Sequence, residues 1–177
     1  MSDGGEQQQA QGIEAVAVES ALTRGYPALA SLLGRAEVAR LARQFLLCHP
    51  FCRAGSDPLD EILPEFLAVA LEEDTQRGAW LPELARLEEA LVRAGDDPRA
   101  GTQLLSFEHR VDELLDELLA GAAWEPPRPT ELLLAIEGAQ GRPRRRELSP
   151  EQWQQRAASP TPPAALPRRA TRGASRG

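Results

Sequence analysis

Apolar residues recur at intervals of three and four positions along the first two thirds of the chain, a spacing that places them on one face of an α-helix. The clearest stretch ends at Pro50, because proline cannot continue a helix. Its apolar face consists of Val38, Leu41, Ala42, Phe45 and Leu46. The same spacing predicts helices over 13–24, 28–33, 59–67, 80–92 and, after Pro98, a longer one to about residue 120. We therefore expect residues 13–121 to form a bundle of five to six helices.

The last third of the chain follows a different pattern. Prolines are frequent over 122–130, which predicts a stiff, extended linker. Beyond it, a short apolar run, turn residues from Gly138 onward and a second run up to Leu148 predict a β-hairpin. Ser149-Pro150-Glu151 is typical of a helix start. Residues 131–158 are thus expected to form a truncated β-hairpin unit with one short helix.

Both ends of the chain are polar. Residues 1–12 are rich in glutamine and predict a disordered leader. Residues 159–177 combine prolines with four arginines and predict a disordered basic tail. The expected fold class is therefore mainly α, with an N-terminal bundle of five to six helices followed by a β-hairpin and helix appendage and a disordered tail.

The net charge of −7 conceals a division between the two parts of the chain. Residues 1–121 carry 22 acidic and 10 basic side chains, a net charge of −12, whereas residues 122–177 carry 5 acidic and 10 basic ones, a net charge of +5. All 20 basic residues are arginines. The absence of lysine excludes Schiff-base chemistry and a phosphate-binding loop of the Gly-Lys-Ser/Thr type.

The sequence does not predict a membrane segment. No apolar run approaches the roughly 20 residues that a membrane-spanning helix needs. The first residues are polar and acidic, which is not typical of a signal peptide. We therefore expect no membrane partner and a cytoplasmic location.

The only cluster of metal-binding residue types is Cys48-His49-Pro50-Phe51-Cys52. A closed zinc site requires four ligands, and His109 is the only other histidine. We interpret His49-Pro50 as a helix end and the cysteines as incidental. The acidic residues between Glu108 and Glu117 lack the Glu-x-x-His pairs of a di-iron bundle, so we interpret them as a solvated helix face.

A Gly-x-Ser-x-Gly pattern occurs at 173–177. In a hydrolase this pattern lies between a strand and a helix, and neither is expected here, so we interpret it as a chance match. The sequence thus predicts no catalytic residue, no metal ligand and no cofactor. We expect the chain not to be an enzyme.

Arginines concentrate around 142–146 and again in the last ten residues. Such clusters can contact nucleic acid, but the acidic first part of the chain repels phosphate at long range. On a strand, the alternating Arg144 and Arg146 would also suit an exposed edge that binds an acidic peptide. A solvated strand face is the third interpretation that these residues leave open.

Several motifs resemble a known family. The run Ala21–Gly34, which contains Tyr26-Pro27, resembles its opening signature, and Leu41–Phe45 with His49-Pro50 resembles its second element. Pro64–Leu67 and Leu81–Ala90 resemble its core. Together these blocks cover roughly residues 20–95 and are similar to the HvfC-like family. The residues that carry the resemblance are Tyr26, Pro27, Gly34, His49, Pro50, Phe66, Leu67, Leu84, Arg86 and Glu88.

The resemblance implies a non-catalytic accessory protein. Members of the family accompany multinuclear non-heme iron-dependent oxidases, bind the oxidase, and help to present a ribosomally made precursor peptide for modification. They join a helical N-terminal domain to a smaller β-containing domain that contacts peptide and enzyme. In this chain only the start of the second domain resembles the family.

On this basis the expected peptide- or partner-binding residues are Leu132, Leu134, Ile136, Arg144 and Arg146. The sequence leaves two alternative functions open. One is a DNA-binding transcriptional regulator that uses the Arg-rich C-terminal part. The other is a degenerate member of the family that serves as a protein-interaction module.

Overall fold

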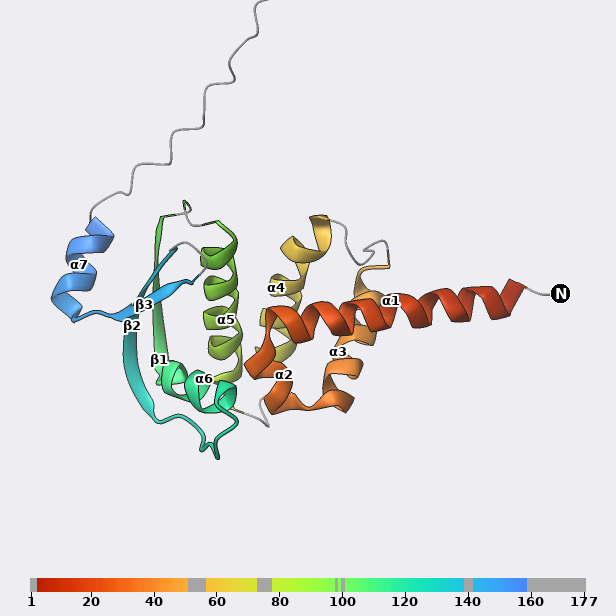
Figure 1. Ribbon diagram of the computed structural model, residues 1–177, viewed down its shortest axis with the longest axis horizontal. Helices are drawn as coiled ribbons and strands as arrows, with labels where there is room; N and C mark the ends of the chain where they lie inside the picture. Colours follow the sequence, from red (N-terminus) through yellow and green to blue (C-terminus); the bar gives the residue numbers. More distant parts are fainter. Residues whose placement is uncertain are drawn as a thin grey trace, which may run out of the picture.

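The computed structural model describes residues 3–50, 57–72, 78–97, 99, 101–138 and 142–158. It confirms the expected fold class, since these residues form seven helices and one three-stranded antiparallel sheet (Figure 1). The tail expected to be disordered lies outside them. In chain order the elements are α1 (Asp3–Gly25), α2 (Pro27–Leu33), α3 (Arg35–Cys48), α4 (Asp57–Glu72), α5 (Leu81–Asp96), β1 (Thr102–His109), α6 (Val111–Leu119), β2 (Pro129–Glu137), β3 (Arg144–Glu147) and α7 (Pro150–Ala158).

The first three helices are separated by residues that cannot continue a helix. Pro27 occupies the first turn of α2. N–H groups in the first turn of a helix have no acceptor within the helix, so the lack of an N–H in proline costs nothing there. Gly34 ends α2 with a φ of +76°, a conformation that favours glycine, and α3 follows at once. α1 begins at Asp3, ten residues before the expected start at Ile13, so it takes in most of the segment expected to be a disordered leader.

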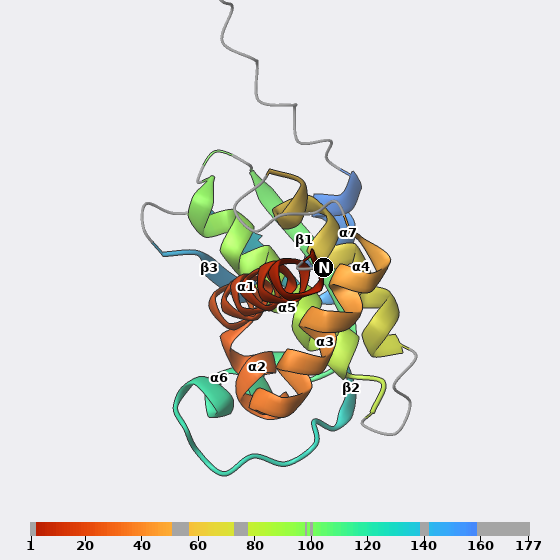
Figure 2. The same cartoon turned by 90° about the vertical axis from the view of Figure 1, so that its right-hand side faces the viewer.

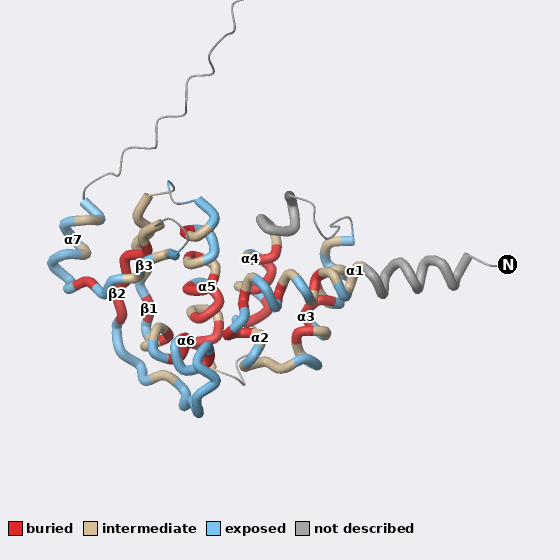
Figure 3. Tube along the Cα trace, viewed as in Figure 1, coloured by how far each residue is buried: buried red, intermediate tan, exposed pale blue. Residues whose placement is uncertain are grey.

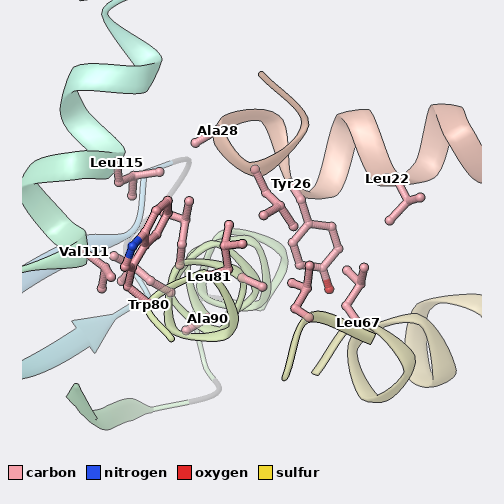
Figure 4. Close-up of a cluster of buried hydrophobic side chains, with 14 of the residues drawn as sticks. Leu22, Tyr26, Ala28, Leu67, Trp80, Leu81, Ala90, Val111 and Leu115 are labelled. Atoms are coloured by element: carbon pink, nitrogen blue, oxygen red, sulfur yellow. The ribbon is translucent and has the colours of Figure 1, made fainter. Parts of the chain in front are cut away.

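α5 lies near the centre of the molecule, with α1, α2, α3 and α4 on one side of it and the sheet on the other (Figures 1 and 2). Leu81, Leu84 and Leu87 on this helix are completely buried. Figure 4 shows the ring of Tyr26 beside α5 and close to Leu67 of α4, whereas Trp80 lies with Val111 and Leu115 of α6. Figure 3 shows the buried residues concentrated along the inner surfaces of α3, α4 and α5.

One prediction, a single helix from Pro98 to about residue 120, is wrong. The helix expected to follow Pro98 begins only at Val111, and Thr102–His109 is a strand inside the segment that we expected to be entirely helical. Leu104 and Phe107 are three residues apart and therefore fit a helix, but Leu105 and Phe107 also fit the two-residue period of a strand. The strand prevails because β2, distant in the sequence, provides a partner for it.

The sheet has the order β1-β2-β3, and both pairs are antiparallel. The hairpin expected from the sequence is therefore present as β2 and β3, with β1 added on the other side. Alternate residues of β2 face opposite ways, as the pleat requires. Leu132, Leu134 and Ile136 join the main hydrophobic core, whereas Leu133 and Ala135 pack with Leu104, Leu148 and Trp153 in a second, smaller cluster.

Candidate peptide-binding surface

β3 is an edge strand. β2 is its neighbour on one side, and among the described residues no strand pairs with the other side. The Leu148 N–H donates to the Leu133 carbonyl oxygen at 2.8 Å, so this is a hydrogen-bonded pair of the ladder. Because such pairs alternate in an antiparallel ladder, the N–H and C=O groups of Arg145 and Glu147 point away from β2.

The side chains of β3 divide between the two faces of the sheet. Arg144 and Arg146 are exposed, and their register partners on β2 are Glu137 and Ala135. Since Ala135 belongs to the smaller hydrophobic cluster, these two arginines lie on the face that carries α7. The edge of β3 thus combines outward main-chain groups with two exposed positive charges.

The opposite face of β3 is bound to α6 by ion pairs. Arg145 forms an ion pair with Asp116, and its Nη1 donates to the Asp112 carbonyl oxygen at 3.3 Å. The Glu147 carboxylate accepts a hydrogen bond of 2.8 Å from Arg110 Nη1. Part of the acidic stretch that we expected to be solvated therefore fixes β3 in place.

Arg110 is the centre of this network. Its Nη2 lies 3.2 Å from Asp112 Oδ2 and 3.1 Å from Glu113 Oε1. The hydrogen bond with Glu147, helped by the nearby carboxylates, raises the pKa of Arg110 above its already high ordinary value. The guanidinium therefore stays charged and holds β3 against the start of α6.

The structure separates the residues expected to bind a peptide into two groups. Leu132, Leu134 and Ile136 are buried in the main core on the central strand, β2, which lies between β1 and β3. A peptide cannot reach these three side chains while the protein is folded. Arg144 and Arg146 are exposed, so the part of the expected surface that a peptide can reach is their strand.

α7 covers the smaller hydrophobic cluster beside this edge. Its start is capped as the sequence predicts, because the Ser149 hydroxyl accepts the Gln152 N–H at 3.3 Å and the Gln152 side-chain oxygen accepts the Ser149 N–H at 3.2 Å. Arg156 pairs with Glu137 of β2 at 3.1 Å, and Trp153 packs on the cluster. The helix thus borders the face on which Arg144 and Arg146 are exposed.

The residues that carry the family resemblance lie mainly at structural junctions. Tyr26 is buried at the start of α2, and Gly34 separates α2 from α3. Phe66, Leu67 and Leu84 belong to the core. His49 follows the last residue of α3 and precedes Pro50, so it ends the helix as the sequence predicts. Its ring centroid lies 4.9 Å from that of Phe45 and 6.3 Å from that of Phe66.

Glu88 has the most specific role among these motif residues. Its carboxylate is buried, with 3% of the residue exposed, and it accepts the N–H groups of Ala28 at 2.7 Å and Leu29 at 2.9 Å. These donors belong to the first turn of α2, where no helical carbonyl is available to them. Glu88 of α5 therefore caps α2 from 60 residues away in the sequence.

Burial raises the pKa of Glu88 to about 7, against the opposing effect of the two N–H donors. The carboxyl group thus binds a proton more tightly in the folded protein than in the unfolded chain. The stabilisation that comes from this bound proton is present below about pH 4.5 and is lost as the pH rises through about 7, whereas the two hydrogen bonds from the N–H groups do not depend on the proton.

This pKa predicts a pH-dependent stability that Glu88→Gln removes. Between pH 4.5 and 7.5 the free energy of unfolding of the wild-type chain should fall by about 3 kcal/mol more than that of the variant. Urea denaturation of both chains at a series of pH values measures the difference. Parallel pH profiles for the two chains would contradict the assignment to Glu88.

Metal-binding residue types do not gather among the described residues: no group of three or more His, Cys, Asp or Glu side chains could hold a metal ion there. Cys48 is exposed, whereas Cys52 and the Gly-x-Ser-x-Gly match lie outside the described residues. Nor does any described helix have the length and apolar character to cross a membrane.

Comparison with known proteins adds no relative. No family model, curated protein or solved structure matches this chain. The family resemblance of the motifs therefore remains a proposal. The interpretation of the surface rests on the geometry of β3 and its neighbours.

Sequence reasoning missed a second carboxylate on α5, that of Glu83, which is half-buried. Glu83 accepts the N–H groups of Glu108 at 2.9 Å and His109 at 3.1 Å, and it lies 3.3 Å from His109 Nδ1. It thereby holds the end of β1 against α5. The sequence signal was weak, because a glutamate in the first turn of a helix ordinarily interacts with its own helix. Arg86, a motif residue on the same helix, lies over the Phe107 ring of β1 at 5.5 Å.

Proposed function

We propose that this chain is a non-catalytic accessory protein that binds an extended, acidic segment of a precursor peptide along β3 and presents it to a multinuclear non-heme iron oxidase. The observation that carries the peptide-binding part is the open edge of β3, on which outward main-chain groups lie beside Arg144 and Arg146. An extended peptide can add to such an edge as a further strand. The oxidase partner follows from the family resemblance alone.

Several features support this mode of binding. The Arg110 and Arg145 ion pairs hold β3 in place, so the edge is arranged before a peptide arrives. A preorganised site loses less conformational entropy on binding. The exposed arginines favour acidic side chains at alternate positions of the added strand, which gives the binding a charge preference.

The peptide-binding part predicts that charge reversal at the edge weakens binding. The probe is a fluorescent ten-residue peptide in which glutamate alternates with threonine, and anisotropy is measured with the full chain. Arg144→Glu combined with Arg146→Glu should weaken binding by about tenfold or more, since two attractive pairs become repulsive. Arg43→Glu, which changes an exposed arginine of α3, is the matched control and should leave binding unchanged.

Main-chain pairing is tested separately with N-methylated versions of the peptide. Methylation of alternate residues removes the N–H groups that face β3 in one version and those that face solvent in the other. Strand addition predicts that only one of the two versions binds. Equal binding of both versions would contradict strand addition, and a preference for duplex DNA that weakens steeply with salt would instead favour the regulator function.

The oxidase partner is tested by co-expression with a multinuclear non-heme iron oxidase from the same gene neighbourhood. A complex that survives size-exclusion chromatography supports the accessory role. Absence of a complex at micromolar concentrations contradicts the partner part of the proposal and leaves the peptide measurement to stand on its own.

A further inference from the structure

A second surface with a distinct character lies between α1, α2 and α3. The three helices enclose an open groove of about 840 Å³. Its apolar wall includes Val16, Pro27, Ala30 and Val38, and 61% of Val16 is exposed. The groove and β3 lie on opposite sides of α5 (Figure 1), so the groove does not form part of the proposed peptide edge.

The charges along this groove differ from those of the surrounding protein. Arg24 and Arg35 line it, both are exposed, and neither forms an ion pair with a carboxylate of the described residues. Among the described residues, the hydrogen-bond partner of Arg24 is the Ser20 carbonyl oxygen, at 3.4 Å. Among the described residues that line the groove, Glu19 is the single acidic one, whereas residues 1–121 carry a net charge of −12. The groove is thus a cationic, apolar site in an acidic part of the protein.

Two segments of the chain itself are unsuitable as occupants of the groove. Its segment 159–177 has four arginines and no acidic residue, so Arg24 and Arg35 would repel it. Its own acidic amphipathic helix, α6, already buries its apolar face in the main core. A second copy therefore could not insert that face without losing its own packing.

We propose that the groove between α1, α2 and α3 binds an acidic amphipathic helix of a partner protein. The apolar face of that helix covers Val16 and Ala30, and its carboxylates pair with Arg24 and Arg35. A helix whose apolar residues are spaced by three and four positions is the ligand that such an interhelical groove accepts. The inference does not depend on the peptide-binding function, and both surfaces can be occupied together.

The test uses an 18-residue peptide that carries leucines at helical spacing and glutamates on both flanks of the leucine face. It is titrated into the full ¹⁵N-labelled chain and followed by NMR. We expect saturable shifts of the amides of Val16, Ala30 and Val38. Arg24→Glu combined with Arg35→Glu should weaken binding at least tenfold, by about the factor that charge reversal at two contacts produces.

Two controls keep this result distinct from that at β3. A peptide with lysine in place of glutamate should not bind, and Arg144→Glu with Arg146→Glu should leave the groove titration unchanged. Equal binding of the two peptides, or shifts confined to β3 and α7, would overturn the inference. Shifts that appear with protein concentration alone would also overturn it, because the occupant would then be a second copy. Circular dichroism verifies that each variant is folded.

Discussion

Replacing Glu88 with alanine should lower the free energy of unfolding by about 3 kcal/mol. The carboxylate is the acceptor for two N–H groups, those of Ala28 and Leu29, and both residues are buried. Water cannot easily replace the lost acceptor at this depth, so two main-chain donors remain without a partner. For a chain of this length the loss corresponds to a decrease in Tm of roughly 10 °C.

The control for this prediction is the neighbouring position. Glu89 is partly exposed, and its carboxylate pairs at 2.5 Å with Arg93 one helical turn later. Because an exposed pair of this kind contributes about 0.5 kcal/mol or less, Glu89→Ala should change stability little. Thermal denaturation of both variants measures the contrast. Similar stability of the two variants would show that capping of α2 by Glu88 is energetically unimportant.

The second large effect concerns Leu134. This residue is 1% exposed on the central strand, and it packs in the main core. Leu134→Ala removes buried methyl groups and leaves a cavity, which should cost about 2–5 kcal/mol of stability. Urea denaturation measures this loss directly.

This prediction also separates two interpretations of Leu134. If the residue bound a peptide, its replacement would weaken peptide binding with little change in stability. The structure predicts instead that stability falls and that the folded protein binds the peptide as before. Any loss of binding should then equal the fraction of the chain that is unfolded. Leu47→Ala is the control, since Leu47 is 83% exposed and its replacement should change stability by less than about 0.5 kcal/mol. Stability equal to that of the wild type in Leu134→Ala would contradict the core assignment.

Local patterns in the sequence were sufficient for most of the helices. The face that contains Leu41 and Phe45 is buried as predicted, and Gly34 ends its helix as a glycine typically does. β1 could not be predicted in this way. Leu104 and Phe107 satisfy the helical spacing, and the choice between helix and strand depends on pairing with β2, more than 20 residues later.

The candidate site was predicted only in part, for a similar reason. The alternation of Arg144 and Arg146 indicated an exposed strand face, and these residues are exposed. The unbroken apolar run within 131–137 is typical of a strand buried on both faces, but it does not indicate which other strands pair with it. The long-range contacts of Glu83 and Glu88 with main-chain donors are likewise not encoded in any local pattern.

The central position of β2 has a consequence for synthesis of the protein on the ribosome. β1 leaves the ribosome before β2, because Phe107 precedes Leu132 in the chain by 25 residues. Synthesis adds about 5–20 residues per second, so β2 is made on the order of a second or more after β1. Among the described residues, β2 is the only strand that pairs with β1. Throughout that interval the preceding helices can assemble, but Leu104, Leu105 and Phe107 of β1 lack the strand with which they pair, so their apolar side chains are accessible to chaperones.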